Sequence, residues 1–117
     1  MSCLQRARKR LRRHTNALIG EGFFGGLSRL GRLHPLSKPA KHGVQVIRDI
    51  DYLRSGSSRH RLDIYRPSNR AGALPIVLYI HGGGFNLLSK NTHWLMGLAF
   101  ARAGYLVFNI DYRLAPE

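Results

Sequence analysis

The chain has 117 residues, a formal net charge of +13, ordinary hydrophobic content and a single cysteine. These values indicate a globular protein of at most one small domain, and they exclude an internal disulfide and a low-complexity chain. No Cys/His cluster has the spacing of a zinc site, so neither a metal nor a cofactor is expected. Because no apolar run approaches the roughly 20 residues that span a bilayer, and none has the form of a secretory signal, we expect a cytoplasmic protein.

The positive charge is concentrated at the N-terminus, before the first acidic residue, Glu21. Leu4, Ala7, Leu11 and Leu18 lie at spacings that suit one side of a helix. One interpretation is a cap helix whose leucines cover the rest of the protein while its arginines face water. The alternatives are a transit peptide, an acidic partner or peripheral contact with an anionic membrane surface. The cationic residues for such a contact are Arg6, Arg8, Lys9, Arg10, Arg12 and Arg13. No aromatic residue lies among them to stack on bases, so nucleic acid is not an expected partner.

Residues 20–31 place Phe23 and Phe24 among glycines, and Pro35 and Pro39 follow. Glycine and proline interrupt regular structure, so this stretch is expected to be a loop-rich linker rather than part of a long helix. We therefore divide the chain into a basic, partly helical segment, residues 1–42, and a folded domain, residues 43–117.

The folded domain begins with a pattern typical of a β-hairpin. Alternation of apolar and polar residues gives the two-residue period of a half-buried strand, with Val44, Val46, Ile50 and Tyr52 as its apolar members. The turn-forming residues 55–58 lead to a second apolar run that ends at Pro67.

Two later strands have a different character. Residues 76–80 and 105–110 are near-continuous apolar runs, as expected of strands buried on both faces of a parallel sheet. Between them, Asn91 or Thr92 is placed to cap a helix that stops at Gly104. A hairpin that feeds a parallel βαβ unit predicts a mixed sheet of the α/β class.

Chemistry is indicated directly after the first of these strands, where His81 is followed by Gly82, Gly83 and Gly84 and then Phe85. Without Cβ atoms, the backbone can adopt positive φ angles and approach a ligand closely, so that adjacent N–H groups can bind one oxygen. Such donors stabilise the oxyanion of an acyl-transfer intermediate. The alternative is a tight turn or a phosphate loop, but the Gly-Lys-Ser/Thr of a Walker loop and the third glycine of a dinucleotide fingerprint are both missing.

The glycine run and the sequence Asp-Tyr-Arg-Leu-Ala-Pro-Glu at residues 111–117 resemble, in order and spacing, the hormone-sensitive-lipase family of α/β-hydrolases. The resemblance covers residues 44–117. It implies the N-terminal part of a mixed, mostly parallel α/β-hydrolase sheet, and a carboxylic ester hydrolase acting on a small-molecule ester.

The resemblance also implies roles for individual residues. Gly83 and Gly84 would donate backbone N–H groups to the oxyanion, and Gly82 would shape the turn. His81 would orient the loop, because in this fold the catalytic histidine follows the serine and the acid along the chain. Phe85 would line the substrate pocket. Arg113 would form an ion pair with Asp111 or Glu117 beneath the active-site loops.

No Gly-x-Ser-x-Gly sequence occurs, so the chain contains neither the nucleophile nor a triad acid or histidine. We therefore expect it to be the N-terminal part of a longer esterase and to be inactive alone. Two alternatives stay open: an amide or formamide hydrolase on the same fold, and a non-catalytic protein of this fold that binds a small ligand.

Overall fold

The computed structural model describes residues 3–116, and at helix positions 3, 4, 13, 14 and 17 it describes the backbone alone. The expected hairpin is present. Strand β1 (Val44–Asp51) pairs antiparallel with β2 (Arg61–Pro67), and a short 3-10 helix, η3 (Ser58–His60), lies between them. A bulge between Ile47 and Ile50 shifts the register, so the alternation seen in the sequence does not continue on one face through the whole strand.

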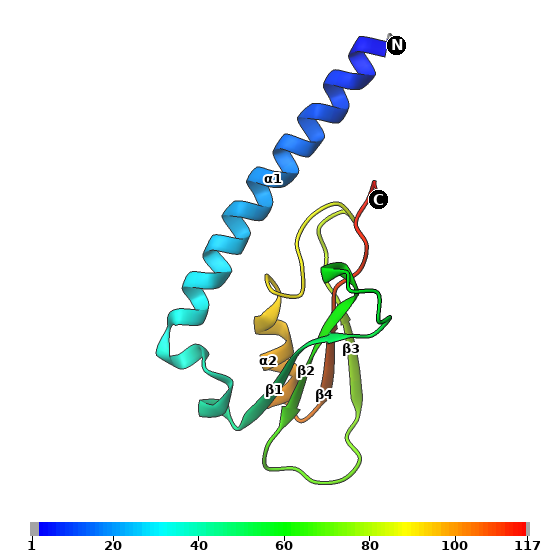
Figure 1. Cartoon of the computed structure of the whole chain (residues 1–117). Helices are drawn as coiled ribbons and strands as arrows, with labels where there is room; N and C mark the ends of the chain where they lie inside the picture. Colours follow the sequence, from blue (N-terminus) through cyan, green and yellow to red (C-terminus); the bar gives the residue numbers. More distant parts are fainter. Residues whose placement is uncertain (1–2, 117) are drawn as a thin grey trace.

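The βαβ unit is also confirmed. Strand β3 (Ile76–Ile80), helix α2 (Trp94–Arg102) and strand β4 (Leu106–Ile110) follow in order, and β3 pairs parallel with β4. The strand order in the sheet is β1-β2-β4-β3, with β2 and β4 antiparallel (Figure 1). The sheet is mixed and the protein belongs to the α/β class. In the described residues, parallel pairing is confined to β3 and β4.

The boundaries of α2 differ at one end from the expectation. Its N-cap is His93, which makes no side-chain capping bond, so the assignment of Asn91 or Thr92 as the cap is wrong. The hydroxyl of Thr92 is engaged instead with the preceding turn, where it accepts the N–H of Ser89. At the other end Gly104 has φ +103° and follows the C-cap residue Ala103, as the sequence predicted.

Helix α2 covers one face of the sheet and builds the core there. Its buried residues Leu98 and Ala101 lie in one cluster with Val44, Tyr65 and Val107 from three strands. Gly97 permits the contact, because a Cβ at this position would lie 2.6 Å from two ring carbons of Tyr65. The helix can therefore approach β2 closely only with glycine at this point.

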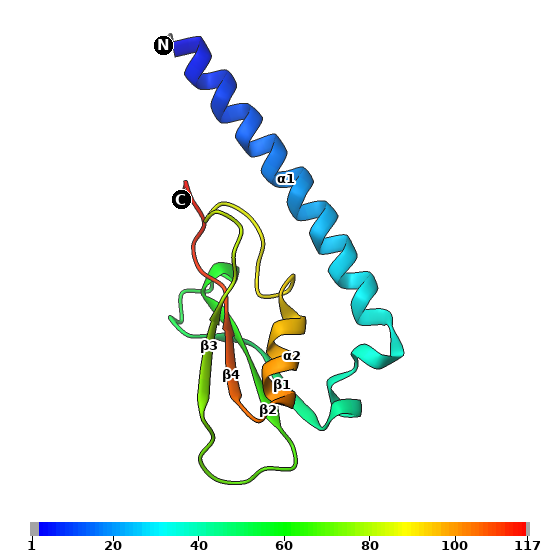
Figure 2. The same cartoon turned by 180° about the vertical axis from the view of Figure 1, so that it is seen from behind.

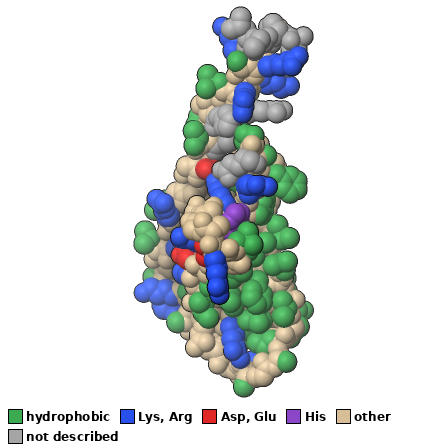
Figure 3. Space-filling view, turned by 45° about the vertical axis from the view of Figure 1, so that its right-hand side comes forward, with side chains coloured by type: hydrophobic (Ala, Val, Ile, Leu, Met, Phe, Trp, Pro, Cys, Tyr) green, Lys and Arg blue, Asp and Glu red, His purple; other side chains and the backbone are tan. Residues whose placement is uncertain are grey.

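The opposite face of the sheet is largely bare within the described residues. Ile76, Leu78 and Ile80 of β3 are 65%, 59% and 56% exposed, and Figure 3 shows hydrophobic side chains gathered over this side of the molecule. The expectation that β3 is buried on both faces is thus met on one face only. Alternate residues of this apolar run pack on α2, and the others point away from it.

The N-terminal segment forms one long helix, α1 (Cys3–Leu33), so the expectation of a loop over residues 20–31 is wrong. Tertiary contacts hold its second half: Arg32 donates to Asn91, and a Cβ on Gly31 would lie 3.5 Å from the Trp94 ring. These contacts outweigh the low helix propensity of glycine, which is a weak local preference. The prolines do end the helix, since two 3-10 turns follow, η1 (Pro35–Ser37) and η2 (Pro39–His42).

The first half of α1 projects beyond the sheet and away from it in both views (Figures 1 and 2). Leu11 and Leu18, two of the leucines expected to cover the protein, are 69% and 70% exposed. Within the described residues, these two leucines therefore cover no other part of the protein. The side chains of Leu4 and Arg13, which belonged to the same expectation, lie outside the described part of the structure.

Candidate functional site

The glycine loop, residues 81–90, leaves β3 at the carboxyl end of the strand, and its shape depends on glycine. Gly83 has φ +124°, and a Cβ there would lie 2.1 Å from the carbonyl oxygen of Leu87. Gly84 has φ +62° but space beside it, with the nearest atom at 3.8 Å. Sterics therefore require glycine at position 83, whereas backbone conformation favours it at position 84. The turn is closed by the Asn86 N–H, which donates to the Gly83 carbonyl at 3.3 Å.

The amide groups of Gly83 and Gly84 are the chemical feature of this loop. Within residues 3–116 neither N–H donates a hydrogen bond to a backbone or side-chain acceptor. Two neighbouring donors without a protein acceptor, at the sheet edge where α/β folds bind their ligands, are suited to receive an oxygen atom.

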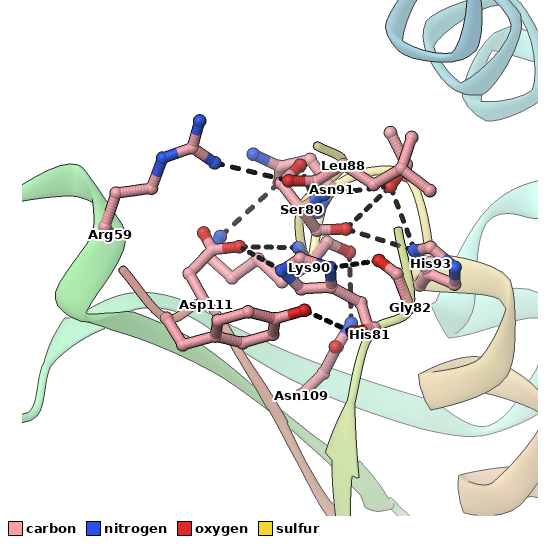
Figure 4. Close-up of polar contacts among 12 residues, drawn as sticks. Arg59, His81, Gly82, Leu88, Ser89, Lys90, Asn91, His93, Asn109 and Asp111 are labelled. Atoms are coloured by element: carbon pink, nitrogen blue, oxygen red, sulfur yellow. Dashed lines mark hydrogen bonds and ion pairs between the residues drawn. The ribbon is translucent and has the colours of Figure 1, made fainter. Parts of the chain in front are cut away.

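The segment that follows β4 holds the glycine loop in place at three points, of which Figure 4 shows the contact between Asp111 and Lys90. Asp111 Oδ1 accepts the Lys90 N–H at 2.7 Å, the Tyr112 hydroxyl donates to the His81 carbonyl at 2.7 Å, and the Ala115 N–H donates to the Phe85 carbonyl at 2.7 Å. The two sequence motifs thus form one structural unit, in which the second motif fixes the conformation of the first.

His81 is buried at the base of the loop. Its Nδ1 lies 2.8 Å from the Gly82 carbonyl, its Nε2 lies 3.6 Å from Asp111 Oδ1 without a hydrogen bond, and its ring stacks on Tyr112 at 4.4 Å and on His93 at 5.7 Å. Burial lowers the pKa of His81 and raises the pKa of Asp111. A neutral ring with its proton on Nδ1, donated to the Gly82 carbonyl, fits this geometry and agrees with the expected loop-orienting role.

Lys90 fastens the far end of the loop to the hairpin, a contact that sequence reasoning missed. The residue is 2% exposed, and its Nζ lies 2.8 Å from Asp49 Oδ1 and 2.8 Å from Asp63 Oδ1. Burial acts to lower the pKa of Lys90, but its hydrogen bonds with the two carboxylates outweigh that effect and raise it. The Lys90 carbonyl accepts Asn109 Nδ2 at 3.1 Å, so both ends of this residue are held. The signal in the sequence that could have indicated this contact is Asp63, a charged residue between the apolar residues of a strand.

Phe85 and Arg113, the other predicted site residues, are exposed at the outer side of the site. Phe85 is 71% exposed, with its ring 6.2 Å from that of Tyr112. Arg113 is exposed and forms no ion pair with Asp111, contrary to the expectation, because that carboxylate is turned toward Lys90 and His81. Glu117, the other expected partner, lies outside the described residues. His93, the N-cap residue of α2, is half-buried against His81 and Tyr79.

Among residues 3–116, no group of three His, Cys, Asp or Glu side chains is arranged to hold a metal ion. In the same residues, no helix has the length and apolar content needed to cross a membrane.

The chain is similar to several known hydrolases. The BD-FAE family matches residues 62–117. The kynurenine formamidase of Danio rerio is 30% identical over 78 residues, which are 67% of this chain and 26% of that protein. The isoprenylcysteine alpha-carbonyl methylesterase of Arabidopsis thaliana is 37% identical over 73 residues, 62% of this chain and 17% of the relative. Tuliposide A-converting enzyme 2 of Tulipa gesneriana is 51% identical over 47 residues, covering 38% and 12%.

Solved structures show the same fold. A bacterial heroin esterase superposes with a TM-score of 0.63 at 23% identity, over 87% of this chain and 31% of that chain. Esterase B of Lactobacillus rhamnosis gives a TM-score of 0.60 at 23% identity, over 84% and 34%. The chain spans about a quarter or less of the curated relatives named here and about a third of these two structures. The chain therefore has the α/β-hydrolase fold of these esterases, and it is similar in sequence to the BD-FAE family, to esterases and to a formamidase.

Proposed function

We propose that residues 81–85 form the oxyanion-binding loop of a carboxylic ester hydrolase. The observation that carries the proposal is the pair of amide groups at Gly83 and Gly84, which have no acceptor within the described residues and lie in a loop held at three points by residues 111–115. When a serine oxygen attacks an ester carbonyl, negative charge develops on the carbonyl oxygen. The two N–H groups would bind that oxygen more strongly in the tetrahedral intermediate than in the ester, and so lower the barrier.

The nucleophile of this reaction lies outside residues 1–117, since the sequence contains no Gly-x-Ser-x-Gly. The proposal therefore assigns the activity to the full-length enzyme that carries these residues. The 117-residue chain alone should show no turnover of an activated ester above the buffer rate. Serine-dependent turnover by the purified chain, abolished by a serine-directed phosphonate, would contradict this assignment.

The substrate class is a small-molecule ester, and an amide or formamide is the alternative. The names of the relatives support both, because one is a methylesterase and another a formamidase. Both reactions pass through a tetrahedral intermediate, so the loop is compatible with either. A panel of matched esters and amides of one acyl group, assayed on the full-length enzyme, tests the proposal. Ester turnover that exceeds amide turnover supports it, and the reverse order supports the amidase.

A third possibility, a non-catalytic ligand-binding protein, makes a separate prediction. It requires binding without turnover, so full-length protein that binds a non-hydrolysable ester analogue yet turns over no member of the panel would favour it. The presence of both Gly83 and Gly84, which an oxyanion site needs, favours the enzyme over the ligand-binding protein.

We also propose that the start of α1 contacts anionic membrane surfaces, as a peripheral function that coexists with catalysis in the cytoplasm. The support is the exposure of its cationic side chains beside exposed apolar ones such as Leu11 and Leu18. The cationic side chains are those of Arg6, Arg8, Lys9, Arg10 and Arg12. The chain should sediment with phosphatidylglycerol vesicles more than with phosphatidylcholine vesicles, and added salt should release it. Equal sedimentation with both vesicle types would contradict the proposal.

A further inference from the structure

A polar cavity of about 430 Å³ lies between α1 and the edge of the sheet, beside the glycine loop but not lined by the glycines. Its wall includes Arg29 and Arg32 from α1, Arg59 and Arg61 from the hairpin, and Lys90. Four segments far apart in the sequence thus meet around it: the second half of α1, the β1–β2 connection, residues 88–92 and Asp111. The volume lies in the range of small-molecule sites, roughly 300 to 1,000 Å³.

The charges around this cavity do not balance. Five cationic side chains line it against three carboxylates, those of Glu21, Asp49 and Asp111, which leaves an excess of two positive charges. Glu21 is engaged with Arg59 at 3.2 Å, and Asp49 with Lys90 at 2.8 Å. Within residues 3–116, Arg29 and Arg61 have no ion pair. An anion entering the cavity would therefore meet two arginines that form no ion pair, although Arg61 is near enough to Asp49 to help lower the pKa of that carboxyl.

Arg32 provides an independent indication of a missing acceptor. Its Nη2 donates to the Asn91 carbonyl at 3.2 Å, while its Nε is buried and has no hydrogen-bond partner. Buried donors are normally satisfied, and an unpaired one is costly. Burial is the main cause that lowers the pKa of Arg32, and the nearby charge of Arg48 adds to it, while Asp63 and Asp49 act in the opposite direction.

We propose that this cavity is a binding site for the phosphate or carboxylate group of a small molecule. Arg29 and Arg61 supply positive charge that is not held in an ion pair within the described residues, and Arg32 supplies the unpaired donor. Residues 88–91 form part of the wall and lie at the far end of the glycine loop, so the bound anion would lie next to the proposed oxyanion site without occupying it. The inference goes beyond ester hydrolysis and does not depend on it, because binding can be measured in the 117-residue chain, which has no nucleophile.

The test is calorimetric titration of the 117-residue chain with inorganic phosphate and, separately, with succinate, at constant ionic strength. We expect saturable one-to-one binding of at least one of the two anions, and their relative affinities show whether phosphate or carboxylate is preferred. Arg29→Gln and Arg61→Gln should each weaken binding roughly tenfold, the loss expected of one charge-assisted hydrogen bond. Glu21→Gln should strengthen binding, since it releases Arg59 from its ion pair.

The matched control is Arg10→Gln, which makes the same change in net charge at an exposed position of α1 away from the cavity. It should bind as the unmodified chain does. Equal weakening by Arg10→Gln and Arg61→Gln would mean that the high net charge attracts anions non-specifically, and it would overturn the proposal, as would the absence of saturable binding of either anion. NMR titration of the unmodified chain adds a measurement that needs no variant: amide shifts should change at residues 88–92, and shifts confined to the N-terminal turns of α1 would contradict the site.

Discussion

Asp111 Oδ1 accepts the backbone N–H of Lys90 at 2.7 Å, which joins the end of β4 to the far end of the glycine loop. The same oxygen lies 3.6 Å from Nε2 of His81, at the near end of the loop. One buried carboxylate therefore contacts both ends of the segment that carries Gly83 and Gly84. This relationship gives a physical reason for the presence of both sequence motifs in one protein.

Asp111→Ala should destabilise the chain by about 1 to 3 kcal/mol, because it leaves the buried N–H of Lys90 without an acceptor. Asp111→Asn retains an oxygen acceptor and should cost less. Urea unfolding measures both, with Arg113→Ala as the exposed control, for which a change within about 0.5 kcal/mol is expected. Equal free energies of unfolding for Asp111→Ala and Arg113→Ala would contradict the proposed link.

Lys90→Met should be more damaging, by about 3 to 5 kcal/mol, because it leaves the fully buried Asp63 without its closest cation. Arg48 is 3.7 Å from the other oxygen of Asp63 and compensates only in part. The double variant Lys90→Met/Asp63→Leu removes both charges and should recover most of the lost stability. If the double variant is as unstable as Lys90→Met, the cost arises from the lysine side chain's packing rather than from the buried charge.

Two glycine substitutions should act in opposite directions. Gly97→Ala places a Cβ 2.6 Å from the ring of Tyr65 and should destabilise the core by about 1 to 3 kcal/mol. Gly22→Ala lies in α1 with no atom within 4 Å of the new methyl group, so it should stabilise the helix by about 0.5 to 1 kcal/mol. Thermal unfolding followed by circular dichroism at 222 nm measures both. A loss of helicity in Gly22→Ala would contradict the continuous α1.

The buried His81 makes a prediction about pH. Because burial lowers its pKa in the folded chain, the unfolded chain binds a proton first as the pH falls through the ordinary value of 6.5. The free energy of unfolding should therefore decrease from pH 7.5 to 5.5 by more in the unmodified chain than in His81→Gln, whose side chain does not titrate. Parallel pH profiles for the two proteins would show that His81 takes up its proton equally in both states.

The strands and the glycine loop could be predicted from sequence because their signals are local. Alternating residues and turn formers mark the hairpin, and Gly104 marks the end of α2. The length of α1 could not be predicted in this way, since contacts of Arg32 and Gly31 with residues 60 or so positions away decide it. Glycines weaken a helix locally, but they do not reveal whether another part of the chain holds it.

The inward face of β2 shows a second limit of sequence patterns. The apolar run that predicts this strand includes Leu62 and Ile64, yet the fully buried side chains are those of Asp63 and Tyr65. Tyr65 packs against α2, and Asp63 pairs with Lys90. One side of β2 carries apolar residues and the other side is buried, so alternation alone does not show which side packs against α2. The burial of Lys90 could not be predicted from the sequence either. A lysine in a loop is normally exposed, and only the pairing with Asp63 explains its burial.

The oxyanion function of the loop is tested most directly at the Gly84 amide, because a side chain at Gly83 would strike the Leu87 carbonyl and deform the loop. In semisynthetic full-length enzyme, an ester oxygen in place of the Gly84 N–H removes the donor without adding a side chain, and the same replacement at Gly82 is the matched control. The account predicts a fall in kcat on an ester substrate of about 10² to 10³ at Gly84, with KM nearly unchanged, and a much smaller effect at Gly82. An unchanged kcat at Gly84, or an equal loss at both positions, would contradict it.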